Sequence, residues 1–323
     1  MSSTRVLALS GGVGGAKLAL GLQRMLAPGA LTVVANTGDD FEHLGLSISP
    51  DVDTILYTLS GRANPETGWG RAEETWHFMT ELEHLGGETW FRLGDRDLAL
   101  HVERTRRLHA GERPTSIVRD FATRLGVQSR VIPMSDDPVR TMLETDAGWL
   151  AFQEYFVRRK CAPGVSAIHY EGAQYARPPT DLVEALATDY FSAVVICPSN
   201  PFLSIDPVLA IPGWRAALHE TRTPVIAVSP IIAAAAVKGP TAKLMRELGL
   251  DVSAAEIASH YEDLLDGFII DTSDSHLSER LEMPVHVTPT LMLSLQDKEA
   301  LATAVLKFAA SLSGNTCMRR AYR

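Results

Sequence analysis

The chain has 323 residues, of which 46% are hydrophobic and 21% charged, with a formal net charge of −9 at pH 7. This composition excludes a disordered chain and suffices for one large α/β domain or two smaller ones. The negative charge gives no sign of nucleic-acid or membrane-surface binding, and no apolar run is long enough for a signal peptide or a membrane span. The three cysteines are far apart and form no Cys-x-x-Cys pair, which fits a cytoplasmic protein and gives no zinc site.

The first element is a glycine-rich turn between an apolar run at 5–9 and a helical pattern at 15–26, in the sequence LALSGGVGGAKLALGL. Glycine permits tight turns and close approach to the backbone, and the free amides at a helix start attract anions. Lys17 adds a positive charge. We predict a phosphate-binding turn at Gly11, Gly12, Gly14, Gly15 and Lys17, with a plain strand–helix turn as the alternative. The turn lacks the Gly-Lys-Ser/Thr of a Walker loop and the third glycine of G-x-G-x-x-G, so it does not specify the nucleotide.

A cluster of carboxylates follows the next predicted strand, 31–35. Four aspartates fall within 15 residues: Asp39, Asp40, Asp51 and Asp53. Carboxylates beside a phosphate site repel the phosphates unless a cation lies between them, and oxygen ligands favour Mg²⁺. The alternative is structural, because Asp51 after Pro50 suits a helix cap and Asp39–Asp40 suits a turn.

The middle of the chain differs from both ends. Residues 62–125 have few strand signals and a helical character, and 130–170 contain short extended pieces. We predict a largely helical insertion over 62–170. LGDRDLAL at 93–100 indicates a helix start with a local ion pair. The tryptophans at 69, 76 and 90 are either the core of this insertion or an aromatic face for a flat ring.

The last part of the chain alternates strand and helix patterns. Strands are predicted at 192–197, 224–228, 267–271 and, more weakly, 285–288, and helices at 181–189, 213–220, 241–248 and 296–312. This alternation predicts an α/β fold with a Rossmann-like, mostly parallel open sheet, whose ligands bind at the carboxyl ends of the strands. Residues 1–61 and 171–314 would form this core and 315–323 a flexible tail. In CPSNPF, Ser199 and Asn200 follow a strand end, where they either grip a base or phosphate or form a ligand-free turn.

Seven segments, in this order, closely resemble the 2-phospho-L-lactate transferase family of coenzyme F-420 biosynthesis. They run from residue 10 to 245 and read SGGVGGAKL, NTGDDFEHLGLSISPDVDT, WGRAEETW, LGDRDLALH, MSDDPV, CPSNPFLSI and VSPIIAAAAVKGPTAKLM. The resemblance implies that a phospho-three-carbon acid moves from a guanosine-diphosphate-activated donor to the terminal ribityl hydroxyl of the deazaflavin Fo, releasing GMP. It also implies Mg²⁺ and a cytoplasmic homodimer that binds neither nucleic acid nor membrane. It leaves open whether the acid is of the phospholactate, phosphoenolpyruvate or phosphoglycerate type.

The resemblance, together with the glycine turn and the tryptophans discussed above, assigns residues to each part of the reaction. Asp51 and Asp40 are the expected catalytic residues. The expected metal ligands are Asp39, Asp40, Asp51 and Asp53. The nucleotide falls to the glycine turn with Lys17, Ser199, Asn200, Pro201 and Lys243. The acceptor falls to Asn36, Thr37, Trp69, Asp95, Arg96 and Asp97.

Two alternatives come from other classes of protein. A related family shares the glycine turn and the strand-end asparagine but binds a UDP-sugar to regulate metabolism. The G-x-G pattern followed by an acidic residue after the second strand is also compatible with an NAD-dependent oxidoreductase, although the third glycine is missing.

Overall fold

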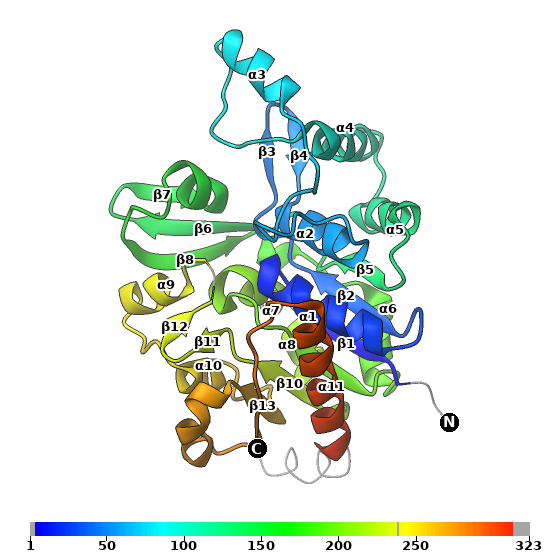
Figure 1. Ribbon diagram of the computed structural model, residues 1–323, viewed down its shortest axis with the longest axis vertical. Helices are drawn as coiled ribbons and strands as arrows, with labels where there is room; N and C mark the ends of the chain where they lie inside the picture. Colours follow the sequence, from blue (N-terminus) through cyan, green and yellow to red (C-terminus); the bar gives the residue numbers. More distant parts are fainter. Residues whose placement is uncertain (1–3, 238, 313–323) are drawn as a thin grey trace.

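The computed structural model describes residues 4–237 and 239–312, and its centre is a parallel seven-stranded sheet (Figure 1). The strand order is β14-β13-β10-β9-β1-β2-β5. The strands are β1 (Val6–Ser10), β2 (Leu31–Ala35), β5 (Arg130–Pro133), β9 (Ala193–Ile196), β10 (Val225–Val228), β13 (Gly267–Ile270) and β14 (Val285–Val287). The prediction of an open, mostly parallel α/β sheet is confirmed.

Helices cover both faces of this sheet because successive strand residues point to opposite sides. In β1, Val6 and Ala8 join one apolar cluster, whereas Leu7 and Leu9 join the other. The first cluster includes helices α1 (Gly12–Met25), α2 (Pro50–Leu59), α5 (Pro114–Leu125) and α11 (Leu295–Leu312). The second includes α6 (Thr180–Ala187), α7 (Asp206–Leu209), α8 (Trp214–Glu220), α9 (Thr241–Glu247) and α10 (Ala254–His260). Two-sided burial explains why the strands read as continuous apolar runs.

Helix α1 begins at Gly12, so the glycine-rich segment forms the first turn of the helix rather than a separate loop. Gly12 has φ +60°, a conformation that favours glycine. A side chain at Gly14 would place Cβ 2.3 Å from the carbonyl oxygen of Pro198. The bare backbone therefore lets α1 start directly against the turn that follows β9.

The chain between α2 and α6 contributes α3 (His77–His84) and α4 (Asp95–His109) to the end of the molecule at the top of Figure 1. It also contains an antiparallel sheet of β6 (Arg140–Thr145), β7 (Gly148–Ala151) and β8 (Val165–Glu171). The hairpin of β3 (Phe41–His43) and β4 (Leu46–Ile48) lies near α3 and α4. β5 lies within 62–170 but pairs with β2 in the central sheet, so that part of the segment belongs to the core.

Short elements complete the described chain. They are the π-helical turns η1 (Glu154–Arg158) and η3 (Pro201–Ile205), the 3-10 segments η2 (Ala173–Tyr175) and η4 (Thr272–Arg280), and the hairpin β11 (Ile231–Ile232) with β12 (Ala235–Ala236). The division into core and insertion otherwise stays a prediction, and the predicted tail at 315–323 lies outside the described residues. None of the helices within 4–237 and 239–312 combines the length and apolarity needed to cross a membrane.

Candidate functional site

A cavity of about 680 Å³ lies between the polar turns at the sheet edge and the aromatic residues of 62–170. Its wall includes the start of α1, the first turns of α2 and the turn after β9. The predicted site residues in this wall are Gly11, Gly12, Gly14, Lys17, Asp39, Asp51, Asp53, Trp69, Asp97, Ser199 and Asn200. The strand-end rule thus brings residues far apart in the sequence to one cavity.

Ser199 ties the turn after β9 to the glycine-rich segment. Its hydroxyl accepts a hydrogen bond from the amide of Gly11 (3.1 Å) and donates to the Gly11 carbonyl (2.8 Å). Asn200 next to it uses Oδ1 to accept the amides of Phe202 (3.0 Å) and Leu203 (3.1 Å). Its Nδ2 is buried and has no hydrogen-bond partner among the described residues. The cavity wall therefore holds an amide donor that a ligand can use.

Asp39 and Asp51 are buried together at the side-chain amide of Asn36. Asn36 Nδ2 donates to Oδ1 of Asp39 and to Oδ2 of Asp51 (3.0 Å), and the Gly12 amide donates to Oδ1 of Asp51 (2.6 Å). Burial raises the pKa of Asp39 well above its ordinary value, and the charges of Asp51 and Asp40 raise it further. Burial also raises the pKa of Asp51 to about 6, against the effect of its hydrogen bonds. This pair needs a proton or a cation to balance its charge.

Asp53 already has a counter-ion. The Arg104 guanidinium binds its carboxylate through both terminal nitrogens, with Nη1 3.0 Å from Oδ2, and both side chains are buried. Burial raises the pKa of Asp53, and the charges of Arg104 and His101 act against that rise. The charge of Asp53 is therefore balanced from within the chain.

Asp40 is not among the described residues that line the cavity. It accepts a hydrogen bond from the Ser49 hydroxyl (2.8 Å). Burial raises its pKa to about 7, although the charges of Arg140 and Arg104 lower it. Its other oxygen, Oδ1, is buried with no hydrogen-bond partner among the described residues.

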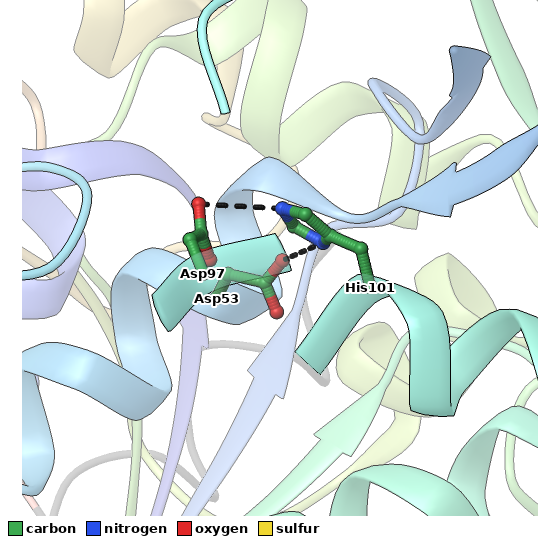
Figure 2. Close-up of side chains that lie close together, drawn as sticks. All are labelled: Asp53, Asp97 and His101. Carbon is green, nitrogen blue, oxygen red and sulfur yellow. Dashed lines mark ion pairs between the residues drawn. The ribbon is translucent and has the colours of Figure 1, made fainter. Parts of the chain in front are cut away.

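His101, Asp97 and Asp53 lie side by side where α4 meets α2 (Figure 2). His101 Nε2 is 3.3 Å from Oδ2 of Asp97, and Nδ1 is 3.6 Å from Oδ2 of Asp53. The Tyr57 hydroxyl donates to the other oxygen of Asp97 (2.5 Å). The sequence reasoning missed His101, Tyr57 and Arg104. The spacing of four residues between Asp97 and His101 within a predicted helix was the available signal.

Aromatic side chains line the opposite part of the cavity. Trp90 and Phe91 pack against each other with ring centroids 5.8 Å apart, and Phe152 stacks on Phe156 at 5.2 Å. Trp69 lines the same cavity and is 56% exposed, so it is not part of a buried core. The wall has apolar faces suited to a flat ring system.

Two of the predicted acceptor residues have structural partners instead. Asp95 accepts the amides of His77 and Phe78 (both 3.0 Å) at the start of α3. Arg96 pairs with Glu73 (3.2 Å). Neither is among the described residues that line the cavity.

The predicted lysines have different positions. Lys17 lines the cavity and donates from Nζ to the Met292 carbonyl (2.8 Å). Lys243 is paired with Glu247 (2.5 Å), and the preceding Gly239–Thr241 segment lines the cavity in its place. Four further predicted residues are also absent from the described part of the wall: Gly15, Asn36, Thr37 and Pro201.

Comparison with known proteins gives a consistent result. A family model described as 2-phospho-L-lactate transferase CofD matches residues 6–306. A phosphoenolpyruvate transferase of Streptomyces avermitilis is 40% identical over 314 residues, covering 94% of this chain and 98% of that protein. A 2-phospho-L-lactate transferase of Methanopyrus kandleri is 41% identical over 315 residues, covering 96% and 99%. A solved structure of a UPF0052-family protein from Bacillus halodurans shares the fold, with 14% identity, a TM-score of 0.62 and coverage of 95% and 99%.

Proposed function

Since this chain belongs to the 2-phospho-L-lactate transferase CofD family, we propose that it transfers a phospho-three-carbon acid from a guanosine-diphosphate-activated donor to Fo. The terminal ribityl oxygen of Fo forms a bond to the phosphorus that bears the acid. The bond from that phosphorus to GMP breaks, and GMP leaves. The observation that carries this proposal is a buried, unbalanced carboxylate pair in a cavity that has phosphate-type turns on one side and aromatic walls on the other.

The donor subsite is proposed at the glycine-rich start of α1 and the turn after β9. The dipole of this 14-residue helix favours phosphate oxygens at its start, although the amides of Gly11 and Gly12 are bound by Ser199 and Asp51. The unpartnered Nδ2 of Asn200 adds a donor, and Lys17 adds positive charge in the same wall. Binding there would fix the donor's orientation, which is the main requirement of phosphoryl transfer.

We place a Mg²⁺ site at Asp39 and Asp51. The chemistry of the pair fits the ion, because two carboxylates share one amide and burial raises the pKa of both. When bound, Mg²⁺ supplies charge stabilisation to the diphosphate. We leave Asp53 out of this set because Arg104 holds its carboxylate, and Asp40 because it is not among the described residues that line the cavity. One carboxylate oxygen of this pair is also proposed to accept the proton of the attacking hydroxyl.

The acceptor ring is proposed to lie among Trp69, Trp90 and Phe91 on one side and Phe152 and Phe156 on the other. Because Trp69 is exposed, its truncation tests binding with little effect on folding. We expect Trp69→Ala to raise the Kd for Fo about 5- to 150-fold, as a stacking loss of roughly 1–3 kcal/mol implies. The Tm and the Kd for GDP should be unchanged in calorimetry and thermal melts.

A matched control is Trp149→Ala, since Trp149 is 53% exposed but lies outside the described cavity wall. This variant should bind Fo as the wild type does. An unaltered Fo affinity in Trp69→Ala, or an equal loss in both variants, would refute the proposed slot.

Two three-carbon acids are the first candidates for the group that is transferred. The relatives are named for phosphoenolpyruvate or for 2-phospho-L-lactate, so donors carrying these two acids are proposed first and phosphoglycerate third. These names favour transfer over the UDP-sugar-binding and NAD-dependent alternatives. The homodimer, the cytoplasmic location and the dependence on Mg²⁺ stay predictions.

A further inference from the structure

The imidazole of His101 places a buried, unsatisfied polar atom in the cavity wall. His101 is 1% exposed and lines the cavity beside Asp97 and Tyr57. Its Nε2 has no well-directed hydrogen bond within the described part of the chain. Buried polar atoms are almost always hydrogen-bonded in native proteins, so one that borders a cavity points to a ligand. Neither the donor subsite nor the Asp39–Asp51 pair uses it.

Arg104 determines which nitrogen of His101 carries the hydrogen. Nη1 of Arg104 is 3.3 Å from Nδ1 of His101 while it also binds Asp53. A guanidinium can only donate, so Nδ1 must accept and the ring hydrogen is assigned to Nε2. That hydrogen lies beside Asp97, whose Oδ2 is 3.3 Å from Nε2 (Figure 2). The wall therefore presents an N–H donor and a carboxylate acceptor next to each other.

This arrangement does not suit a metal ion. One ligand atom each of Asp53, Asp97 and His101 lies within 4.8 Å of the other two, but Arg104 already binds both oxygens of Asp53 and faces Nδ1 of His101. The charge of Asp53 is also already balanced by Arg104. The donor–acceptor pair suits a neutral group that can both accept and donate through one atom, which is the property of a hydroxyl. A phosphate or carboxylate would be repelled by Asp97.

We propose that His101 and Asp97 bind a hydroxyl of the acceptor's polyol chain. The hydroxyl oxygen accepts from Nε2–H of His101, and its hydrogen is donated to Oδ2 of Asp97. Arg104 and Tyr57 are positioning residues: Arg104 sets the tautomer of His101, and Tyr57 holds the other oxygen of Asp97. This inference rests on the proposed function, since it assigns a subsite for the ribityl chain of Fo.

The test compares Fo with an analogue whose internal ribityl hydroxyls are replaced by hydrogen, using calorimetric titration. The side-chain amide of asparagine at position 101 can still face Arg104, but it is too short to reach the position of Nε2. The longer glutamine side chain can place its amide nitrogen at that position. His101→Asn should weaken Fo binding roughly 5- to 150-fold, the effect of an unpaired buried partner. His101→Gln should recover most of the affinity. The wild type and His101→Asn should bind the analogue with affinities that differ by no more than about twofold. Removing the hydroxyl and replacing His101 each delete the same interaction, so the second change costs little more.

Two results would overturn the subsite while leaving the proposed function intact. One is wild-type affinity for Fo in His101→Asn. The other is an equal loss for Fo and the analogue, which would show that the substitution acts through the fold. Tyr57→Phe is a second test variant, for use if the substitution of His101 destabilises α4. It too should weaken the binding of Fo more than the binding of the analogue. If the wild type binds neither compound, the proposed acceptor is wrong and the subsite falls with it.

Discussion

Replacing Asp51 by asparagine is expected to lower the rate of transfer by at least about 10²–10⁴-fold, the range of a lost catalytic proton acceptor. The substitution keeps the shape of the side chain and removes the charge on which Mg²⁺ binding and proton transfer depend. The Gly12 amide still has an acceptor at position 51, so the glycine-rich turn keeps its support. The measurement is GMP release with Fo and donor in saturating Mg²⁺.

The same variant separates a chemical role from a structural one. Because burial raises the pKa of Asp51, its charge is unfavourable without a cation, and Asp51→Asn should melt no lower than the wild type in excess chelator. Mg²⁺ should raise the Tm of the wild type and leave that of Asp51→Asn unchanged. Full turnover by the variant, or undiminished wild-type turnover in chelator, would contradict the metal site.

A second large effect is expected from Asn200→Asp. The carboxylate keeps an oxygen to accept the amides of Phe202 and Leu203, so the turn after β9 stays capped. The unpartnered Nδ2 is replaced by a negatively charged oxygen, which repels a diphosphate. Losing a hydrogen bond to a charged group corresponds to about 13- to 160-fold in affinity, and repulsion adds to it. GDP affinity measured by calorimetry should fall by at least that factor, with Fo affinity unchanged.

Asn64→Asp is the matched control. Asn64 accepts the Glu66 amide through Oδ1 (2.9 Å) in the same kind of turn, but it lies outside the described cavity wall. Its replacement should leave both affinities as they are. GDP binding by Asn200→Asp at wild-type strength would remove Asn200 from the donor subsite.

The alternation of apolar runs with helical patterns was sufficient to predict the parallel sheet, since its central strands β1, β2, β9, β10 and β13 are buried along their whole length and are almost entirely apolar. β5 falls among the short extended pieces predicted at 130–170 and was assigned to the insertion, because its place in the core is fixed by pairing with β2 far earlier in the chain. α10 was missed. This short helix is defined by the burial of Ile257 and Ala258 in the folded chain rather than by a strong local pattern in the sequence.

The candidate site was predictable where it depends on the ends of strands. The glycine-rich turn, Asp39, Ser199 and Asn200 follow strands whose carboxyl ends meet at one edge, and Asp51 joins them from the first turn of α2. The sequence does not show which of the carboxylates already has its charge balanced by a basic side chain. Asp53 and Arg104 are 51 positions apart and meet only through the packing of α4 on α2. Likewise, the sequence does not show that Lys243 pairs with Glu247 and is not among the described residues that line the cavity.

The most direct test of the central claim is product analysis by mass spectrometry. Purified protein is incubated with Fo, Mg²⁺ and a guanosine-diphosphate-activated donor carrying either phosphoenolpyruvate or 2-phospho-L-lactate. The account predicts that one donor gives Fo joined to the acid through a phosphodiester, with one GMP formed for each product molecule. Unchanged Fo with both donors, or release of GDP in place of GMP, would contradict it.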